Sequence, residues 1–117
     1  MDRCILLIDD DPDELDIFSE ALAEIEKSIV CIQARSARAS MNLLKSLMPD
    51  YIFLDVNMPE INGLKCLEEI RRVRALKNVP VILYSNYIDE VLLQKQLLLV
   101  FRLILKSQKR SANLQKY

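Results

Sequence analysis

Short, continuously apolar runs alternate along the chain with longer stretches in which apolar residues recur every three or four positions. Runs such as Ile5–Ile8 and Tyr51–Leu54 are typical of strands buried on both faces of a parallel sheet, and the spaced residues predict amphipathic helices. Strands are predicted near residues 5–8, 29–34, 51–54, 79–84 and 101–105, and helices near residues 12–25, 36–47, 63–73 and 88–99. This order predicts an α/β fold, with a five-stranded parallel sheet and helices on both of its faces.

Composition and charge narrow the class of protein. The chain has 117 residues, the size of one domain, and 51% of them are hydrophobic. None of its apolar runs approaches the roughly 18 residues of a membrane span, and its acidic start does not resemble a secretory signal. The basic residues are spread through the second half of the chain rather than interleaved with aromatic readers. We therefore expect a single cytoplasmic domain over residues 1–117, without an effector domain and without nucleic-acid or membrane binding.

The inventory of reactive side chains excludes several chemistries. The chain has no histidine, and its three cysteines form no C-x-x-C pair. The common zinc sites and the histidine-dependent nucleophile systems are therefore ruled out. Cys66 stands at helical spacing from Ile70 and Val73, which predicts a small core residue rather than a reactive thiol. Any chemistry must come from carboxylates, hydroxyls and lysines.

Polar side chains stand where four of the five predicted strands end: Asp9 with Asp10, Asp55, Ser85 and Lys106. Because the carboxyl ends of parallel strands meet at one edge of a sheet, these side chains are expected to converge. Three neighbouring carboxylates repel one another unless a cation lies among them. Oxygen ligands beside a lysine and a hydroxyl suit Mg²⁺ and a phosphoryl group, with one carboxylate as nucleophile. Each residue alone has an ordinary structural explanation, so the prediction depends on their joint placement.

Four features carry a resemblance to a known family: ILLIDDDP at residues 5–12, LDVNMP at 54–59 with Gly63 after it, ILYS at 82–85, and the apolar run into Lys106. Thirty residues separate Asp55 from Ser85, and twenty-one separate Ser85 from Lys106. With these motifs and spacings the chain resembles, over essentially its whole length, the CheY-like receiver domains of response regulators in two-component phosphorelay signalling.

The resemblance implies a flavodoxin-like doubly wound sheet of strand order 2-1-3-4-5. It implies that Asp55 is the phosphoacceptor, which takes a phosphoryl group from a phosphohistidine of a sensor histidine kinase or a histidine phosphotransfer protein. Ser85 would provide the switch hydroxyl, and Lys106 would contact the phosphoryl group. Such a protein is a self-phosphorylating switch rather than an enzyme, with at most autophosphatase activity.

The resemblance also implies a metal cofactor, Mg²⁺. Asp10, Asp55 and the backbone carbonyl of Asn57 would hold the ion, and Asp9 would act largely through a bound water.

Three positions depart from the family pattern. Ser107 follows Lys106 where the family usually has a proline after a cis bond. The Lys106–Ser107 peptide is therefore predicted either to be trans, with a displaced lysine, or to stay cis because the phosphate pocket holds it. Leu103 occupies the position where an aromatic switch residue often stands, and Asn86 is bulkier than the usual alanine. We expect Asn86 to obstruct access to the acyl phosphate.

The output is expected at a protein–protein contact made by a monomer or a weak dimer. The family uses the face formed by its fourth helix, fifth strand and last helix, which here includes Val91–Phe101 and Arg102. For the leucines of this segment, core packing is favoured over such a contact. A degenerate receiver, acting as a phosphate-independent interaction or dimerisation module, is the second function. The presence of all five site residues argues against it, whereas Ser107 and Leu103 keep it open. A haloacid-dehalogenase-like phosphatase is ranked last, because Asn57 stands where that family needs a second aspartate.

Overall fold

A computed structural model of the chain describes residues 3–58, 63–84, 91 and 94–103. Within these residues the strands are β1 (Cys4–Ile8), β2 (Val30–Ala34), β3 (Tyr51–Asp55) and β4 (Val81–Tyr84). The helices are α1 (Asp13–Ile25), α2 (Ala37–Leu43), α3 (Gly63–Arg72), the short 3₁₀ helix η1 (Arg74–Leu76) and a helix at residues 94–103, which we call helix 94–103. The strands form one parallel sheet in the order β2-β1-β3-β4, which confirms the predicted fold class.

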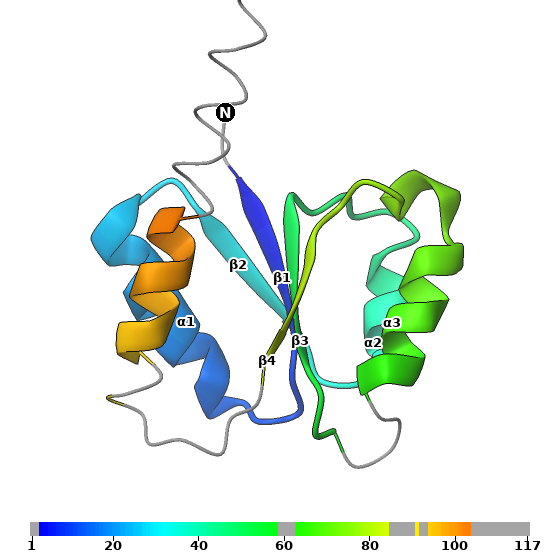
Figure 1. Cartoon of the computed structure of the whole chain (residues 1–117), viewed down its shortest axis with the longest axis horizontal. Coiled ribbons are helices and arrows are strands. Elements are labelled where there is room, and N and C mark those ends of the chain that lie inside the picture. Colours follow the sequence, from blue (N-terminus) through cyan, green and yellow to red (C-terminus); the bar gives the residue numbers. More distant parts are fainter. Residues whose placement is uncertain (1–2, 59–62, 85–90, 92–93, 104–117) are drawn as a thin grey trace, which may run out of the picture.

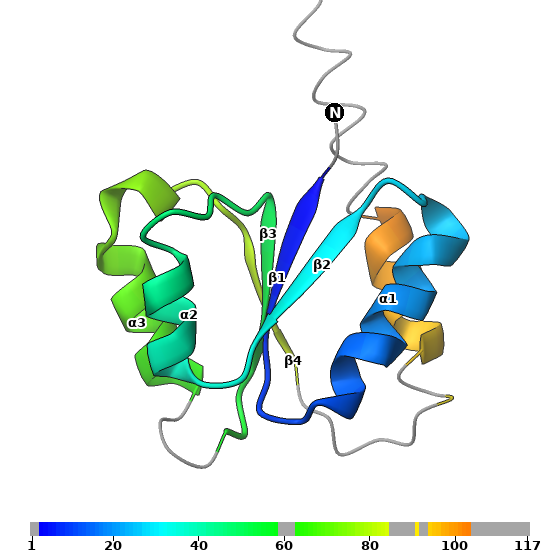
Figure 2. The same ribbon diagram turned by 180° about the vertical axis from the view of Figure 1, so that it is seen from behind.

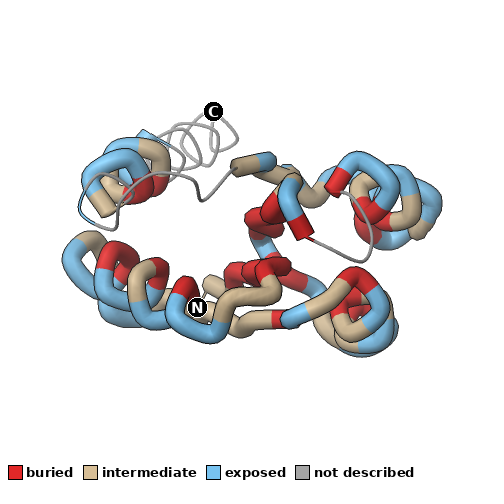
Figure 3. Tube along the Cα trace, turned by 90° about the horizontal axis from the view of Figure 1, so that it is seen from below, coloured by how far each residue is buried: buried red, intermediate tan, exposed pale blue. Residues whose placement is uncertain are grey.

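Helices cover both faces of this sheet. Helices α2 and α3 lie against one face, and α1 lies with helix 94–103 against the other (Figure 1, and from behind in Figure 2). Each strand therefore needs apolar side chains on both faces, which explains why the strand sequences are continuously apolar rather than alternating. In Figure 3 the buried segments gather in the central sheet and on the inner sides of the helices.

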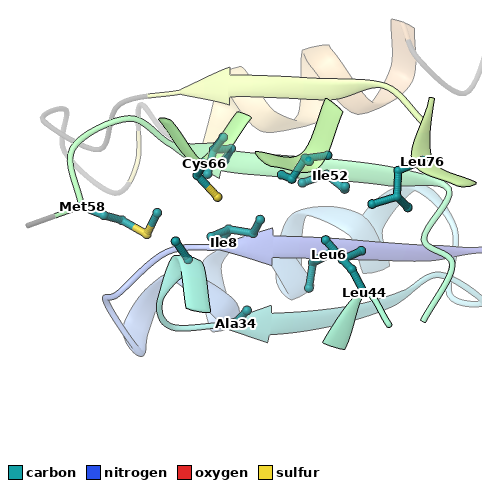
Figure 4. Packing of buried hydrophobic residues seen from close by; sticks show 11 residues of the cluster. Leu6, Ile8, Ala34, Leu44, Ile52, Met58, Cys66 and Leu76 are labelled. Atoms are coloured by element: carbon teal, nitrogen blue, oxygen red, sulfur yellow. The ribbon is translucent and has the colours of Figure 1, made fainter. Parts of the chain in front are cut away.

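Two hydrophobic cores result, one on each face. In β1, Leu6 and Ile8 pack toward α2 and α3, whereas Ile5 and Leu7 pack toward α1. The first core is shown in Figure 4, where Cys66 of α3 points toward the sheet. Cys66 is fully buried, as the helical spacing predicts, and burial raises the pKa of its thiol.

A polar residue just before each of the first two helices accepts a hydrogen bond from the helix backbone. The side chain of Asp11 accepts from the N–H of Asp13 at 2.9 Å, and the hydroxyl of Ser36 accepts from the N–H of Ala39 at 3.0 Å. Such bonds satisfy donors that have no partner inside the helix. The hydrogen bond between Asp13 and Asp11 therefore helps to fix the segment between β1 and α1, which lies at the carboxyl edge of the sheet.

The prediction of a fifth strand beginning at Phe101 is wrong for residues 101–103, which are helical. Leu97 and Phe101 are one helical turn apart, and both are buried against the face of the sheet that α1 covers. The leucine-rich run contains no glycine to end the helix, so the pattern also fits a helix that continues through Leu103. Residues 104 and 105 lie outside the described residues.

The leucine-rich segment is divided between core and surface. Leu97 and Phe101 are buried, whereas Val91, Leu99 and Leu103 are exposed by 64%, 62% and 59%. Core packing therefore applies to Leu97 and Phe101, whereas the exposed residues remain available for a protein–protein contact.

Candidate functional site

Three carboxylates meet at the carboxyl edge of the sheet. Asp9 directly follows β1 and Asp55 ends β3, and these two strands are hydrogen-bonded neighbours. One carboxylate oxygen from each of Asp9, Asp10 and Asp55 lies within 4.8 Å of the others. The parallel pairing thus brings together residues that are separated by some 46 positions in sequence, as the strand ends predict.

Asp9 is fully buried and is held by two hydrogen bonds. Its Oδ1 accepts from the backbone N–H of Asp11 at 2.9 Å, and its Oδ2 accepts from the hydroxyl of Tyr84. Burial is the largest influence on this carboxyl and raises its pKa to about 6. The two hydrogen bonds oppose the rise, and the negative charges of Asp55 and Asp10 add to it.

Asp55 is 1% exposed, and its Oδ1 accepts a hydrogen bond from the backbone N–H of Asn57 at 2.9 Å. Burial raises the pKa of this carboxyl, the Asn57 N–H lowers it, and the nearby charge of Asp10 raises it further. Buried carboxylates without a compensating cation are costly. Both Asp9 and Asp55 are therefore placed where binding a cation would stabilise their ionised forms.

The segment after β1 is fixed from the neighbouring strand by a residue that the sequence motifs do not identify. Gln33 of β2 donates from Nε2 to the carbonyl oxygens of Asp9 at 2.8 Å and Asp11 at 2.7 Å. Arg35 makes a longer contact of 3.4 Å from Nε to the carbonyl oxygen of Asp10. Gln33 is the only polar residue of β2, and this break in an apolar strand is the signal that could have identified it.

Tyr84 is the second residue that sequence reasoning misses. It belongs to the ILYS motif, but a tyrosine in an apolar strand has the same pattern as any core residue. Its hydroxyl reaches the acidic cluster and contacts Asp9 directly. Burial is the first cause that raises the pKa of this phenol, followed by its hydrogen bond to Asp9, so the hydroxyl stays protonated and acts as a donor.

The structure brings together three of the expected site residues and places a fourth beside them. Asp9, Asp10 and Asp55 form the cluster, and Asn57 lies in the turn after β3 with its N–H on Asp55. Other residues of the prediction, namely Ser85, Asn86, Lys106 and Ser107, lie outside the described residues.

The cluster has the ligand chemistry of a hard divalent cation. Mg²⁺ takes oxygen ligands at about 2.0–2.1 Å, so two opposite ligands lie about 4 Å apart. The three carboxylate oxygens all lie within 4.8 Å of one another, slightly more than that span. Asp9, Asp10 and Asp55 therefore lie close enough to share one cation, directly or through a water, and a carboxylate beside such a cation can accept a phosphoryl group.

Fold and site together define a doubly wound α/β domain that presents an acidic cluster at the carboxyl edge of its sheet. A family model described as "Response regulator receiver domain" matches residues 5–115. The chain belongs to this family, whose members are signalling switches of two-component systems.

Curated relatives match the chain over part of their own length. The probable C4-dicarboxylate response regulator DctR of Bacillus subtilis is 35% identical over 78 residues, which are 67% of this chain and 34% of that relative. The protein-glutamate methylesterase/protein-glutamine glutaminase of Agrobacterium fabrum is 38% identical over 82 residues, which are 70% of this chain and 22% of that enzyme. The chain thus spans about a third or less of these two relatives.

Solved structures of response regulators share the fold. The phosphorylated cyanobacterial phytochrome response regulator RcpA has a TM-score of 0.67 and 27% identity, covering 83% of this chain and 76% of its own. A structure of histidine kinase ThkA in complex with response regulator protein TrrA matches with a TM-score of 0.63 and 29% identity. The match covers 74% of this chain and 72% of that one. The Mn²⁺-bound form of response regulator Rcp1 matches with a TM-score of 0.64 and 26% identity. The match covers 81% of this chain and 75% of that one.

Among the described residues, no helix combines the length and the apolar character that crossing a membrane requires.

Proposed function

We propose that this chain is a phosphoacceptor switch in which Asp55 takes a phosphoryl group from a phosphohistidine on a histidine kinase or a histidine phosphotransfer protein. The observation that carries the proposal is the placement of Asp55, which is buried at the end of β3 with two further carboxylates within 4.8 Å. Two buried carboxylates with a third beside them are unfavourable unless a cation compensates their charge. The phosphorylated state of RcpA and the complex of ThkA with TrrA support the same chemistry for a chain of this family.

In the proposed transfer, a carboxylate oxygen of Asp55 attacks the phosphorus atom of the phosphohistidine. A P–O bond forms and the P–N bond breaks, and the leaving imidazole nitrogen keeps the electron pair and takes up a proton. Asp55 must be ionised to attack, and the N–H of Asn57 favours that form against the effect of burial. We propose that Ser85 donates its hydroxyl to a phosphoryl oxygen and that Lys106 contacts the phosphoryl group.

We propose Mg²⁺ as the cation of this site. Asp10, Asp55 and the carbonyl of Asn57 would hold it, and Asp9 would act through a water. When bound, the ion offsets the negative charge of the carboxylates and of the phosphoryl oxygens. The Mn²⁺-bound form of Rcp1 supports a divalent cation in a protein of this fold.

We propose that residues 1–117 act as one receiver domain in the cytoplasm, as a monomer or a weak dimer. Phosphorylation adds charge and acceptor oxygens at the edge of the sheet, and this biases the contact with a downstream protein. The exposed side chains of Leu99 and Leu103 on helix 94–103 are candidates for that contact.

The test is to incubate the protein with Mg²⁺ and a small acyl-phosphate donor and to record its intact mass. We expect a gain of one phosphoryl group that requires Mg²⁺ and is lost in Asp55→Asn. Asp16→Asn is the matched control, because Asp16 is an exposed aspartate on α1. We expect this variant to take up the phosphoryl group as the wild type does.

Failure of this experiment has a defined meaning. If no adduct forms and the stable mimic beryllium fluoride does not bind either, the chain is a phosphate-independent interaction module. Uptake that persists in Asp55→Asn would assign the acceptor to another side chain.

A further inference from the structure

Tyr84 ends β4 and contacts the acidic cluster and the turn after Asp55 at three points. Its backbone pairs with Asp55 in the register of β3 and β4, and its carbonyl oxygen accepts from the N–H of Val56 at 3.0 Å. Its hydroxyl donates to Oδ2 of Asp9. Because β3 lies between β4 and β1, this hydrogen bond joins two strands that are not neighbours. Strands in a sheet are about 4.8 Å apart, so only a long side chain spans the distance.

The ring of Tyr84 belongs to the core beneath the site. Its centroid lies 5.4 Å from that of Phe18 on α1. Phe18 in turn lies 5.4 Å from Phe53 and 6.1 Å from Phe101, and Phe53 lies 5.1 Å from Phe101. These four rings, which we call the aromatic cluster, connect the acidic edge of the sheet to helix 94–103.

The hydrogen bond of Tyr84 determines how Asp9 presents its carboxylate. Oδ1 is held by the N–H of Asp11 and Oδ2 by the phenol, so both oxygens are fixed and the plane of the carboxylate is set. Each carboxylate oxygen has two acceptor sites, so neither hydrogen bond prevents a cation or its water from using the same oxygen. Asp9 would act on the cation through a water, so it belongs to the outer shell of the site, and outer-shell partners contribute about 10- to 100-fold to metal affinity.

We propose that Tyr84 is a positioning residue for the cation site, orienting Asp9 through its hydroxyl and linking the occupancy of that site to helix 94–103 through the aromatic cluster. The proposal rests on the proposed function, because the cation is the one assigned to the acidic cluster. Any change in the position of the Asp9 carboxylate would be passed to the phenol that donates to it, and from the Tyr84 ring to Phe18, because cores are closely packed. Phe18 contacts Phe101, so helix 94–103 responds.

The test compares the wild type with Tyr84→Phe, which keeps the ring and removes the hydroxyl. Tyr51→Phe is the matched control, because Tyr51 begins β3 at the edge of the sheet opposite Asp55. Binding of Mn²⁺ is titrated by the electron paramagnetic resonance signal of the free ion, without any phosphoryl donor. We expect the Kd of Tyr84→Phe to rise by about 10-fold. The Kd of Tyr51→Phe should stay close to the wild-type value.

A second measurement tests the link to helix 94–103. Saturating Mg²⁺ is added to the wild type and to Tyr84→Phe, and the chemical shifts of the Phe101 ring protons are recorded by NMR. We expect a Mg²⁺-dependent shift in the wild type that is strongly reduced in Tyr84→Phe at saturation. Equal shifts in both proteins would overturn the link.

The outcomes separate this proposal from the proposed function. If Tyr84→Phe binds Mn²⁺ as tightly as the wild type or more tightly, the positioning role is wrong, while phosphoryl uptake by the wild type still supports the phosphoacceptor function. If the wild type binds Mn²⁺ and Tyr84→Phe weakens binding but no phosphoryl group is taken up, the positioning role holds and the phosphoacceptor function fails. A Tyr84→Phe protein that lacks the wild-type circular dichroism spectrum would be replaced by Phe18→Leu, for which we expect a reduced Mg²⁺-dependent shift at Phe101 and near wild-type Mn²⁺ affinity.

Discussion

Gly63 packs so closely against Val56 that a Cβ atom added at Gly63 would lie 2.6 Å from the Val56 Cα. It would also lie 3.0 Å from the carbonyl oxygen of Asp55. The obstacle is backbone, which cannot rotate away as a flexible side chain can. Gly63 begins α3, so this contact sets the position of that helix against the turn that follows the candidate phosphoacceptor.

We expect Gly63→Ala to destabilise the protein by about 1–3 kcal/mol, the usual cost of forcing extra volume into a packed site. Alanine is better than glycine inside a helix by about 1 kcal/mol, so the substitution would stabilise α3 if there were room for the methyl group. Urea denaturation measures the difference. Leu64→Ala is the control at the next position of α3, where the side chain is 60% exposed and the expected change is within about 0.5 kcal/mol. A stabilised Gly63→Ala protein would contradict the close approach.

The acidic cluster could be predicted because its geometry follows from topology alone. Asp9 and Asp55 each follow an apolar run, and parallel strands place their carboxyl ends at one edge. The partners that hold these carboxylates could not be predicted in the same way. Gln33 and Tyr84 act through the reach of a side chain across the sheet, which depends on strand order and register rather than on spacing along the chain.

The helix at residues 94–103 shows where the hydrophobic pattern leaves two solutions. The run from Leu97 to Phe101 is apolar enough for a buried strand, and the chain has no glycine there to separate helix from strand. The spacing of four between Leu97 and Phe101 favours a helix only when Phe18 and Phe53 are already in place to receive it. Tertiary packing therefore decides the structure of this segment.

Gln33→Met should loosen the segment after β1, because methionine has a similar length but cannot donate to the carbonyl oxygens of Asp9 and Asp11. Two hydrogen bonds are lost, and each contributes about 0.5–1.5 kcal/mol net. We expect the free energy of unfolding to fall by about 1–3 kcal/mol, as measured in urea. Mn²⁺ affinity should fall as well. The same change at Gln94, on helix 94–103, is the control, and equal effects at both positions would show that the contacts of Gln33 have no special role.

Phe101→Ala should cost about 3–5 kcal/mol, because the ring is 2% exposed and contacts both Phe18 and Phe53. Leu103→Ala distinguishes helix from strand. In a strand, residues 101 and 103 would share one face, and both truncations would be costly. In helix 94–103 the Leu103 side chain is 59% exposed, so we expect a change within about 0.5 kcal/mol. Thermal unfolding of the two variants gives the comparison, and a large loss in both would restore the strand.

The acidic cluster should make the cation-free protein less stable as the pH rises through the range in which Asp9 ionises. Burial raises the pKa of Asp9 to about 6 in the folded protein, from an ordinary value of 3.8, and Asp55 is raised in the same direction. Between these two values the folded state binds more protons than the unfolded state, so the free energy of unfolding falls with increasing pH. The fall slows as the pH passes the folded pKa of about 6 and levels off above it. We expect the Tm in the presence of a chelator to fall from about pH 4.5 to about pH 7, with a shallower fall in Asp9→Asn, whose side chain does not ionise.

Mg²⁺ binds the ionised carboxylates, so the increase in Tm that it produces should be larger at the higher pH. A wild-type profile that matches Asp9→Asn with chelator present would mean that Asp9 ionises in the folded protein as easily as it does in the unfolded chain.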